Sequence, residues 1–433
     1  MNGRDLRRDY AVTSMSRYWP RMEEVVAALP IPQVELDSEW SWPPRGVEVP
    51  LPEWAADLGV GGGLLVPAEV VPPGADPAWA RTDWLTAVFW YLTGAAERRY
   101  EQLHGPIHSS ASRLRDWDNR FWNRAWVNRT ALFLRRWAAR AKGMAETALF
   151  GPLPEPEIIL THDVDAVAKT MAIRGKGTVW FCLQALTRPA RNKANFLSMG
   201  RQAAGFLTSR ADYWRFDQIK EREDLAGVRS HFNFYGGPGG WKRNPRQWLL
   251  DPGYSVLDRD VQREIKELHR GGWTIGLHQS FAAWNQAGLM AEEKTRVEEA
   301  LGTPVMSCRQ HWLRFSWMTT WKAQQEAGLR LDTTLGFNDR PGFRTGAALR
   351  FHPWDQAEGR PLTMEALPLI LMDSHLYGHE ATNEEERMAW MKYWIDEVRQ
   401  VCGTATINWH QQTMSPDYGW AEGYRGLLGL ISG

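Results

Sequence analysis

The chain of 433 residues is 43% hydrophobic and 24% charged, which is the composition of a soluble globular protein with one large and one smaller domain. Lys and Arg together number 51, as do Asp and Glu, so no overall charge directs the molecule toward nucleic acid or a membrane. The three cysteines are scattered, which indicates neither a disulfide framework nor a cysteine zinc cluster. The 25 tryptophans mildly favour a glycan ligand, because aromatic faces stack on sugar rings.

The sequence shows no targeting or membrane-spanning signal. Its first residues lack the apolar core of a signal peptide. The longest apolar stretch, residues 85–96, is shorter than the roughly 20 residues that a membrane helix needs. We therefore expect a cytoplasmic protein without a transmembrane segment.

Residues 1–150 are expected to form a smaller, mainly helical domain of unknown role. Residues 1 to about 75 are rich in Pro, Trp and Gly, with few periodic signals. Two helices are predicted after them, one beginning near Thr82 and one over about 113–142, with nine basic residues against two acidic ones. The basic face is interpreted as solvated, with docking to an anionic surface as the alternative. The proline-rich stretch 151–156 predicts the domain boundary.

Residues 151–433 alternate between strand and helix signals, which predicts a parallel α/β sheet closed into a barrel. The predicted strands are 157–162, 229–235, 273–278, 306–311, 329–333, 366–372 and 404–410. The predicted helices include 258–270, 290–301 and 317–327.

The first strand of this barrel runs directly into two carboxylates, Asp163 and Asp165. Burying both charges would be costly unless they meet a metal, a partner or water. The carboxyl ends of parallel strands are also where α/β folds keep their chemistry. Because strand side chains alternate, Thr161, Asp163 and Asp165 share one face, which we interpret as the edge of an active site.

Other predicted strands also end in polar side chains that share one parity. These are His231 with Asn233, Gly276 with His278 and Ser280, Arg309 with His311, and Asn408 with His410. A single strand-end histidine is often only a hydrogen-bonded structural residue, but the repetition favours functional roles for His278 and His410. For His231 and His311, a structural and a functional role both remain open. Asp373 either lines the mouth of the barrel or is a turn residue.

Five motifs of this segment stand in the order and at the spacing found in NodB-type polysaccharide deacetylases, which residues 157–412 resemble. They are Thr161 to Asp165, Ile275 to His278, Arg309 to Trp312, Asp332 to Phe337 and Asn408 to His410. The first is similar to the Thr-His-Asp-Val-Asp branch of the family. The resemblance implies an α/β fold, a distorted, partly open (β/α) barrel, with one divalent metal, usually zinc, at the carboxyl ends of its strands.

By motif position, the resemblance also implies roles for individual residues. Asp163 is similar to the catalytic base, His410 to the general acid and Arg309 to the arginine that braces the base. Asp165 and His278 are similar to metal ligands. The activity implied is hydrolysis of a carbon–nitrogen bond that is not a peptide bond, removing N-acetyl groups from an amino sugar in a surface polysaccharide or its precursor.

The sequence departs from the family in its second motif. The usual second histidine, four residues after the first, is replaced by Ala282, which cannot bind a metal. Either His231 or His311 completes the ligand set from another strand, or Asp165 and His278 hold the ion weakly with water. A metal-free site is a further alternative.

The resemblance also implies that Trp354 or a neighbour lines the substrate pocket, and Asp332 and Trp312 of its motifs are predicted to bind substrate with it. Residues 171–211, with seven basic and no acidic residues, follow the first strand as an insertion in the barrel domain, 151–433. This insertion is predicted to contact an anionic glycan or a lipid-linked sugar at a membrane face. Two solvated surface helices are the alternative.

Two other functions remain open from the sequence. One is hydrolysis of another linear or cyclic amide on the same barrel, which the missing histidine at Ala282 favours. The other is a carbohydrate-binding relative without turnover, which the presence of Asp163 and His410 disfavours. The sugar, the metal and the oligomeric state are not specified by the sequence.

Overall fold

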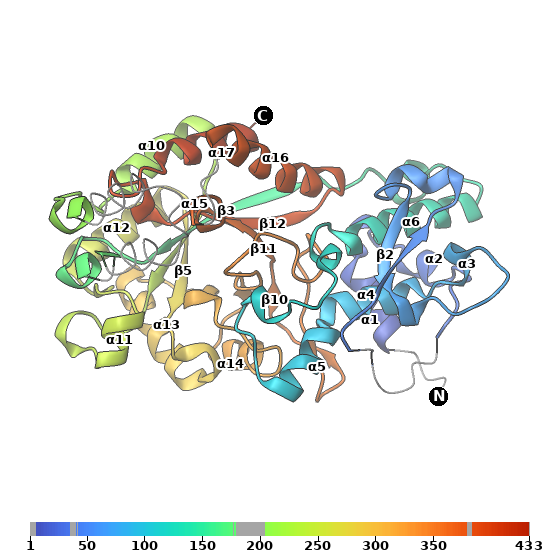
Figure 1. The fold of residues 1–433 in the computed structure, drawn as a ribbon, viewed down its shortest axis with the longest axis horizontal. Coiled ribbons are helices and arrows are strands. Elements are labelled where there is room, and N and C mark those ends of the chain that lie inside the picture. The colour runs from blue at the N-terminus through green and yellow to red at the C-terminus, as the bar shows by residue number, and fades with distance from the viewer. Residues whose placement is uncertain are drawn as a thin grey trace, which may run out of the picture.

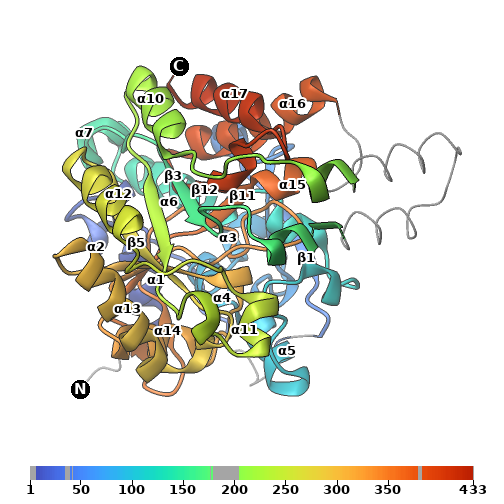
Figure 2. The same cartoon turned by 90° about the vertical axis from the view of Figure 1, so that its left-hand side faces the viewer.

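The computed structural model describes residues 6–34, 40, 42–175, 177–178, 204–378 and 383–432. Its centre is an eight-stranded parallel sheet in the order β10-β7-β6-β5-β4-β3-β12-β11. The sheet curls into a half-barrel whose edge strands are β10 and β11 (Figures 1 and 2). The expected fold class, a distorted and partly open (β/α) barrel, is confirmed.

The seven predicted segments correspond to eight strands, because the segment 366–372 is divided between β10 and β11, and several strands are shorter than predicted. Their bounds are β3 Glu157–Val164, β4 His231–Tyr235, β5 Thr274–Gln279, β6 Ser307–Gln310, β7 Leu331–Asp332, β10 Glu365–Ala366, β11 Leu369–Met372 and β12 Thr404–Asn408. Every residue of β6, β11 and β12 is buried, as expected for strands of a parallel sheet with both faces covered. In register, Asp163 of β3 lies beside Asn233 of β4, which lies beside Gly276 of β5.

Helices cover the outer face of the half-barrel, with α10, α16 and α17 on one side and α12, α13 and α14 on the other (Figure 1). The helices of this part are α10 Phe216–Ala226, α11 Pro245–Leu250, α12 Arg259–Arg270, α13 Ala287–Leu301, α14 Thr320–Glu326, α15 Asp373–Tyr377, α16 Glu384–Gln400 and α17 Ala421–Ser432. In α12 the buried residues Val261, Ile265 and Leu268 recur at three- and four-residue spacing, which directs one apolar stripe to the sheet. A short antiparallel pair, β8 Trp354–Asp355 and β9 Arg360–Pro361, precedes β10.

The amino-terminal region combines a hairpin with helices and lies at the right of Figure 1. Its elements are α1 Leu6–Ser14, α2 Glu23–Ala27, β1 Gly46–Pro50, β2 Gly63–Pro67, α3 Ala78–Arg81, α4 Trp84–Thr93, α5 Ala95–His104, α6 Trp126–Ala141 and α7 Glu146–Phe150. One hydrophobic core continues from these helices into the barrel region, since Tyr10 of α1 and Phe89 of α4 pack against Trp354.

The predicted helix over 113–142 is too long. The structure has α6 only from Trp126, preceded by two short 3₁₀ turns, Ala111–Arg113 and Asn119–Trp122. The Asp118 carboxylate accepts a hydrogen bond from the Arg120 amide, and the Trp122 carbonyl accepts one from the Phe343 amide of the barrel region. These bonds use backbone groups that a continuous helix would need, so tertiary contacts override the helical pattern.

Most of the basic insertion at 171–211, including Arg188, Arg191, Lys193 and Arg201, lies outside the described residues. Its predicted contact with glycan or membrane therefore stays a prediction. Within the described part of the chain, no helix is both long and apolar enough to cross a membrane.

A buried ion pair joins the amino-terminal region to the outer helices of the barrel. Arg129 of α6 donates to both carboxylate oxygens of Glu397 on α16, at 2.8 and 2.6 Å. The same carboxylate accepts a hydrogen bond from the Ala125 amide at the start of α6, at 3.0 Å. Glu397 thus binds both the side chain and the backbone of α6.

Replacing Glu397 with Ala is expected to lower the free energy of unfolding by about 3 kcal/mol, because it leaves the buried Arg129 guanidinium uncompensated. Urea denaturation of the purified variant measures this loss. Glu385→Ala, an exposed glutamate in the first turn of the same helix, is the control and should change stability by less than about 0.5 kcal/mol. Equal effects of the two substitutions would contradict the assignment.

Candidate active site

Three predicted residues, Asp165, His278 and His311, meet at the carboxyl ends of β3, β5 and β6. Asp165 follows β3 directly, His278 lies near the end of β5, and His311 follows β6. One ligand atom from each lies within 4.8 Å of the other two. The Nε2 atoms of His278 and His311 are 3.3 and 3.6 Å from the same carboxylate oxygen, Asp165 Oδ1.

Both imidazoles are fixed by hydrogen bonds on the side that faces away from Asp165. His278 Nδ1 lies 3.0 Å from the Arg309 carbonyl, an acceptor, so this nitrogen carries the proton. His311 Nδ1 lies 3.3 Å from Asp251 Oδ1, which also accepts the Phe281 amide at 2.7 Å. These contacts leave the Nε2 lone pair of each ring free to bind a cation, as in histidine metal ligands oriented by outer carboxylates and carbonyls.

The donor set fits a divalent cation such as zinc. Apart from facing each other, the buried atoms Asp165 Oδ1 and His278 Nε2 have no hydrogen-bond partner among the described residues. A tetrahedral zinc ion, with bonds of about 2.0–2.2 Å, holds its ligands roughly 3.3–3.5 Å apart, which is close to the distances seen here. One carboxylate and two imidazoles also leave open positions, as in catalytic rather than structural zinc sites.

His231, the other residue considered for the third ligand position, is not a member of this group. It is the first residue of β4 and pairs with Thr161 and Thr274, so it lies before the level of Asp163 in the sheet. Burial, with a smaller contribution from Arg309, lowers the pKa of His231 to about 4. The structure therefore favours His311 over His231 as the replacement for the histidine missing at Ala282.

Asp163 lies on the same strand face as Asp165 and is buried beside a fully buried arginine. Its Oδ1 accepts a hydrogen bond from Asn233 Nδ2 at 2.9 Å and faces Arg309 Nη1 at 3.5 Å. Burial acts to raise the pKa of Asp163, but Arg309 and the neighbouring histidines outweigh it and hold that pKa below its ordinary value. The carboxyl group is thus kept as a carboxylate, able to accept a proton.

Arg309 is held by two other strands, β3 and β12, and by the residue that follows β7. It donates to the Thr333 carbonyl at 3.0 Å, to Thr161 Oγ1 at 2.6 Å and to Thr406 Oγ1 at 3.3 Å. These bonds fix the guanidinium in one place, so Asp163 meets a positive charge whose position does not depend on solvent.

His410 approaches the group from the segment that follows β12, and its partner is an aspartate whose role the sequence left open. Asp373 Oδ1 lies 2.7 Å from His410 Nδ1, and Asp373 Oδ2 accepts the His410 amide at 2.8 Å. Burial acts to lower the pKa of His410, but Asp373 outweighs it and raises that pKa to about 10. The other ring nitrogen, Nε2, lies 3.7 Å from Asp165 Oδ2, so a charged imidazole faces the site.

The structure separates the three residues expected to line the substrate pocket. Trp312, next to His311, is 55% exposed and its indole Nε1 donates to the Leu250 carbonyl at 3.2 Å. The Trp354 ring packs against helices α1 and α4 of the amino-terminal region, as described above, and not beside the three-residue group. Only Trp312 of these three therefore presents an exposed surface next to the site.

Asp332 is fully buried, and its carboxylate is occupied by the protein itself. Its oxygens accept hydrogen bonds from Thr334 Oγ1 at 2.5 Å, Trp321 Nε1 at 2.9 Å and Gln324 Nε2 at 2.9 Å. The expected contact of Asp332 with substrate is not supported, because these bonds already satisfy its acceptors. Motif spacing placed Asp332 and Trp354 near the pocket, but it carried no information on which way their side chains pack.

Sequence reasoning missed Asp251 and left Asp373 undecided. Asp373 follows the buried strand β11 directly, which is the same strand-then-carboxylate pattern that identified Asp163 and Asp165. Asp251 follows the short helix α11 and has no periodic signal around it. Only the tertiary structure brings it to His311.

No protein-family profile and no curated protein matches the chain. Among solved structures it is similar to a candidate polysaccharide deacetylase of Mycobacterium smegmatis, with 17% identity and a TM-score of 0.38 over 64% of this chain and 88% of that one. It is also similar to the polysaccharide deacetylase Bc1974 of Bacillus cereus, with 9% identity and a TM-score of 0.31 over 64% and 86%. A third is BA3943 of Bacillus anthracis, a CE4 family pseudoenzyme, with 9% identity and a TM-score of 0.31 over 64% and 60%.

Two of these three proteins are named as polysaccharide deacetylases. The chemistry of the site follows from its own residues.

Proposed function

We propose that the protein is a metal-dependent hydrolase that removes N-acetyl groups from an amino sugar of a surface polysaccharide or its lipid-linked precursor. The convergence of Asp165, His278 and His311 on one cation-sized place, with Asp163 on the same strand face, carries this proposal. Zinc is the proposed ion, because two imidazoles and one carboxylate are a typical catalytic zinc set.

Two residues around this place would each carry out one of the proton transfers of amide hydrolysis. When bound, a zinc ion would polarise the amide carbonyl and make a nearby water more acidic. Asp163, kept ionised by Arg309, accepts the proton of the attacking water. His410, kept protonated by Asp373, donates a proton to the leaving amine nitrogen. Trp312 offers its exposed indole face to the sugar ring.

Hydrolysis of another linear or cyclic amide is the second candidate. The observation that favours it is Ala282, since the histidine of the family's second motif is absent and the proposed third ligand, His311, lies in the turn after the next strand, β6. A non-catalytic carbohydrate-binding role fits less well, because Asp163 and His410 keep the protonation states that catalysis needs.

Elemental analysis and a two-substrate assay test the proposal. Protein purified without chelator is expected to contain about one zinc ion per chain and to release acetate from oligomers of N-acetylglucosamine. Removal of the ion by a chelator should abolish this release, and added zinc should restore it. Turnover of a cyclic imide without acetate release would favour the second candidate, and absence of any divalent metal would contradict the proposed site.

A further inference from the structure

The turn that carries His311 and Trp312 has an unusual backbone conformation. It is a 3₁₀ turn, His311–Leu313, that follows β6 directly. Trp312 and Leu313 have φ angles of 57° and 45°. This left-handed region costs free energy in residues with a Cβ atom, so a turn of this kind persists only when its surroundings hold it.

A second turn of the same kind lies against it and comes from the amino-terminal region. His108 and Ser109, in the loop after α5, have φ angles of 49° and 71°. Among the described non-glycine residues six have a positive φ, and four of these lie in the two facing turns. Such a concentration at one contact next to the candidate site indicates function rather than chance.

Hydrogen bonds join the two turns directly. The hydroxyl of Ser109, which is fully buried, donates to the Leu313 carbonyl at 2.6 Å. His108 Nδ1 lies 3.3 Å from the Phe315 carbonyl, and its Nε2 accepts a hydrogen bond from Arg314 Nη2 at 3.0 Å. Burial and Arg314 lower the pKa of His108 to about 4, which keeps the ring neutral and able to accept this bond.

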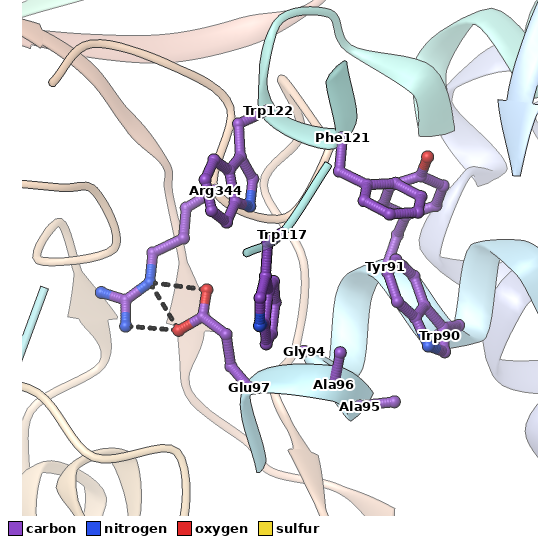
Figure 3. Close-up of a pocket in the computed structure, with 10 residues that line it drawn as sticks. All are labelled: Trp90, Tyr91, Gly94, Ala95, Ala96, Glu97, Trp117, Phe121, Trp122 and Arg344. Atoms are coloured by element: carbon purple, nitrogen blue, oxygen red, sulfur yellow. Dashed lines mark hydrogen bonds and ion pairs between the residues drawn. The ribbon is translucent and has the colours of Figure 1, made fainter. Parts of the chain in front are cut away.

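Residues that follow β7 tie the Ser109 turn in place. Arg344 Nη1 donates to Ser109 Oγ at 2.6 Å, and Nη2 of the same guanidinium forms a buried ion pair with Glu97 of α5 at 2.7 Å (Figure 3). Asn338 bridges the two turns. Its backbone N–H donates to the Ser109 carbonyl at 2.9 Å, and its side-chain Nδ2 donates to the Trp312 carbonyl at 2.5 Å. The Ser109 hydroxyl is thus the centre of this connection.

We propose that the His108–Ser109 turn is a clamp through which the amino-terminal region holds the His311–Leu313 turn in its left-handed conformation. Ser109 is a positioning residue. It touches neither ligand nor substrate, but it fixes the segment that carries the metal-binding imidazole of His311 and the exposed indole of Trp312. This inference rests on the proposed metal site and gives the amino-terminal region a role in it.

Two variants without the hydroxyl test the clamp. Ser109→Ala removes the bond to Leu313, and Ser109→Gly removes it too while favouring the left-handed backbone at this position, which protects folding. Ser112→Ala, on the exposed face of the same loop, is the matched control. Amide hydrogen exchange and zinc affinity are measured on the full-length protein, the zinc affinity by competition with a chelator.

In both Ser109 variants the backbone amide hydrogens of residues 311–315 are expected to exchange with solvent about tenfold faster, because one hydrogen bond that holds the turn is lost. Both variants should bind zinc about tenfold more weakly, because the turn that carries His311 is held less firmly. Exchange in β12 should stay unchanged, and Ser112→Ala should match the original protein in both measurements.

Unchanged exchange at 311–315, or unchanged zinc affinity in both Ser109 variants, would overturn the clamp. Neither measurement needs a substrate. If the original protein binds zinc but hydrolyses no acetylated sugar, only the proposed function is contradicted, and the clamp is not. Failure of the original protein to bind zinc would likewise remove the proposed function, while the exchange of residues 311–315 would still decide whether the clamp exists.

Discussion

Replacing Asp163 with Asn is expected to lower kcat for acetate release by about a thousandfold, because an amide of the same shape cannot accept the proton of water. Zinc content should stay at the level of the original protein. Asp163 is not one of the three residues whose ligand atoms converge, and its Oδ1 faces Asn233 and Arg309 instead. Steady-state kinetics together with elemental analysis of the same sample measure both effects.

The control for this substitution is Asp260→Asn, an exposed aspartate on α12 that should leave kcat unchanged. Loss of zinc from the Asp163→Asn protein would reassign Asp163 as a ligand. Retention of full activity with zinc bound would mean that another group accepts the proton.

Removing the imidazole of His311 should weaken zinc binding by more than the roughly 10–100-fold that the loss of an outer partner costs. The Nε2 atom of His311 faces Asp165 at 3.6 Å, and its loss leaves only one carboxylate and one imidazole for the ion. Titration of His311→Ala with zinc against a competing chelator measures the change.

His231→Ala is the matched control, because it removes an imidazole from the neighbouring strand β4 without touching the three-residue group. Its zinc affinity should equal that of the original protein. The reverse result, with His231 essential and His311 dispensable, would show that the ligand set is assembled differently.

The sequence predicts the barrel and much of the site because both depend on short-range patterns. Buried strands ending in polar groups, read with a period of two, place Asp163, Asp165, His278 and His410 on one side of the sheet before any coordinates are known. The same patterns predict most of the central strands to within a few residues, but β7 is paired only in the middle of its predicted segment and β10 was not predicted as a separate strand.

The remaining features depend on tertiary contacts that no local pattern records. The choice between His231 and His311 depends on where each lies along the strands. His231 is the first residue of β4, whereas His311 lies in a turn beyond the carboxyl end of β6. Asp251 reaches His311 from a distant loop, and Trp354 packs against helices that precede it by more than two hundred residues. In the same way, the helix predicted from residue 113 gives way to turns whose backbone groups bind the barrel.

His311 and Trp312 are consecutive in the chain, so ion and glycan would share a single short peptide. Any motion that the clamp leaves to this peptide would be lost when the first ligand binds and would not have to be lost again for the second, which would make their binding cooperative without any larger movement. Thermodynamic linkage requires the effect to be mutual: a saturating oligosaccharide should tighten zinc by the same factor by which zinc tightens the oligosaccharide. The zinc concentration would then determine the affinity of the protein for the oligosaccharide as well as the rate of its hydrolysis.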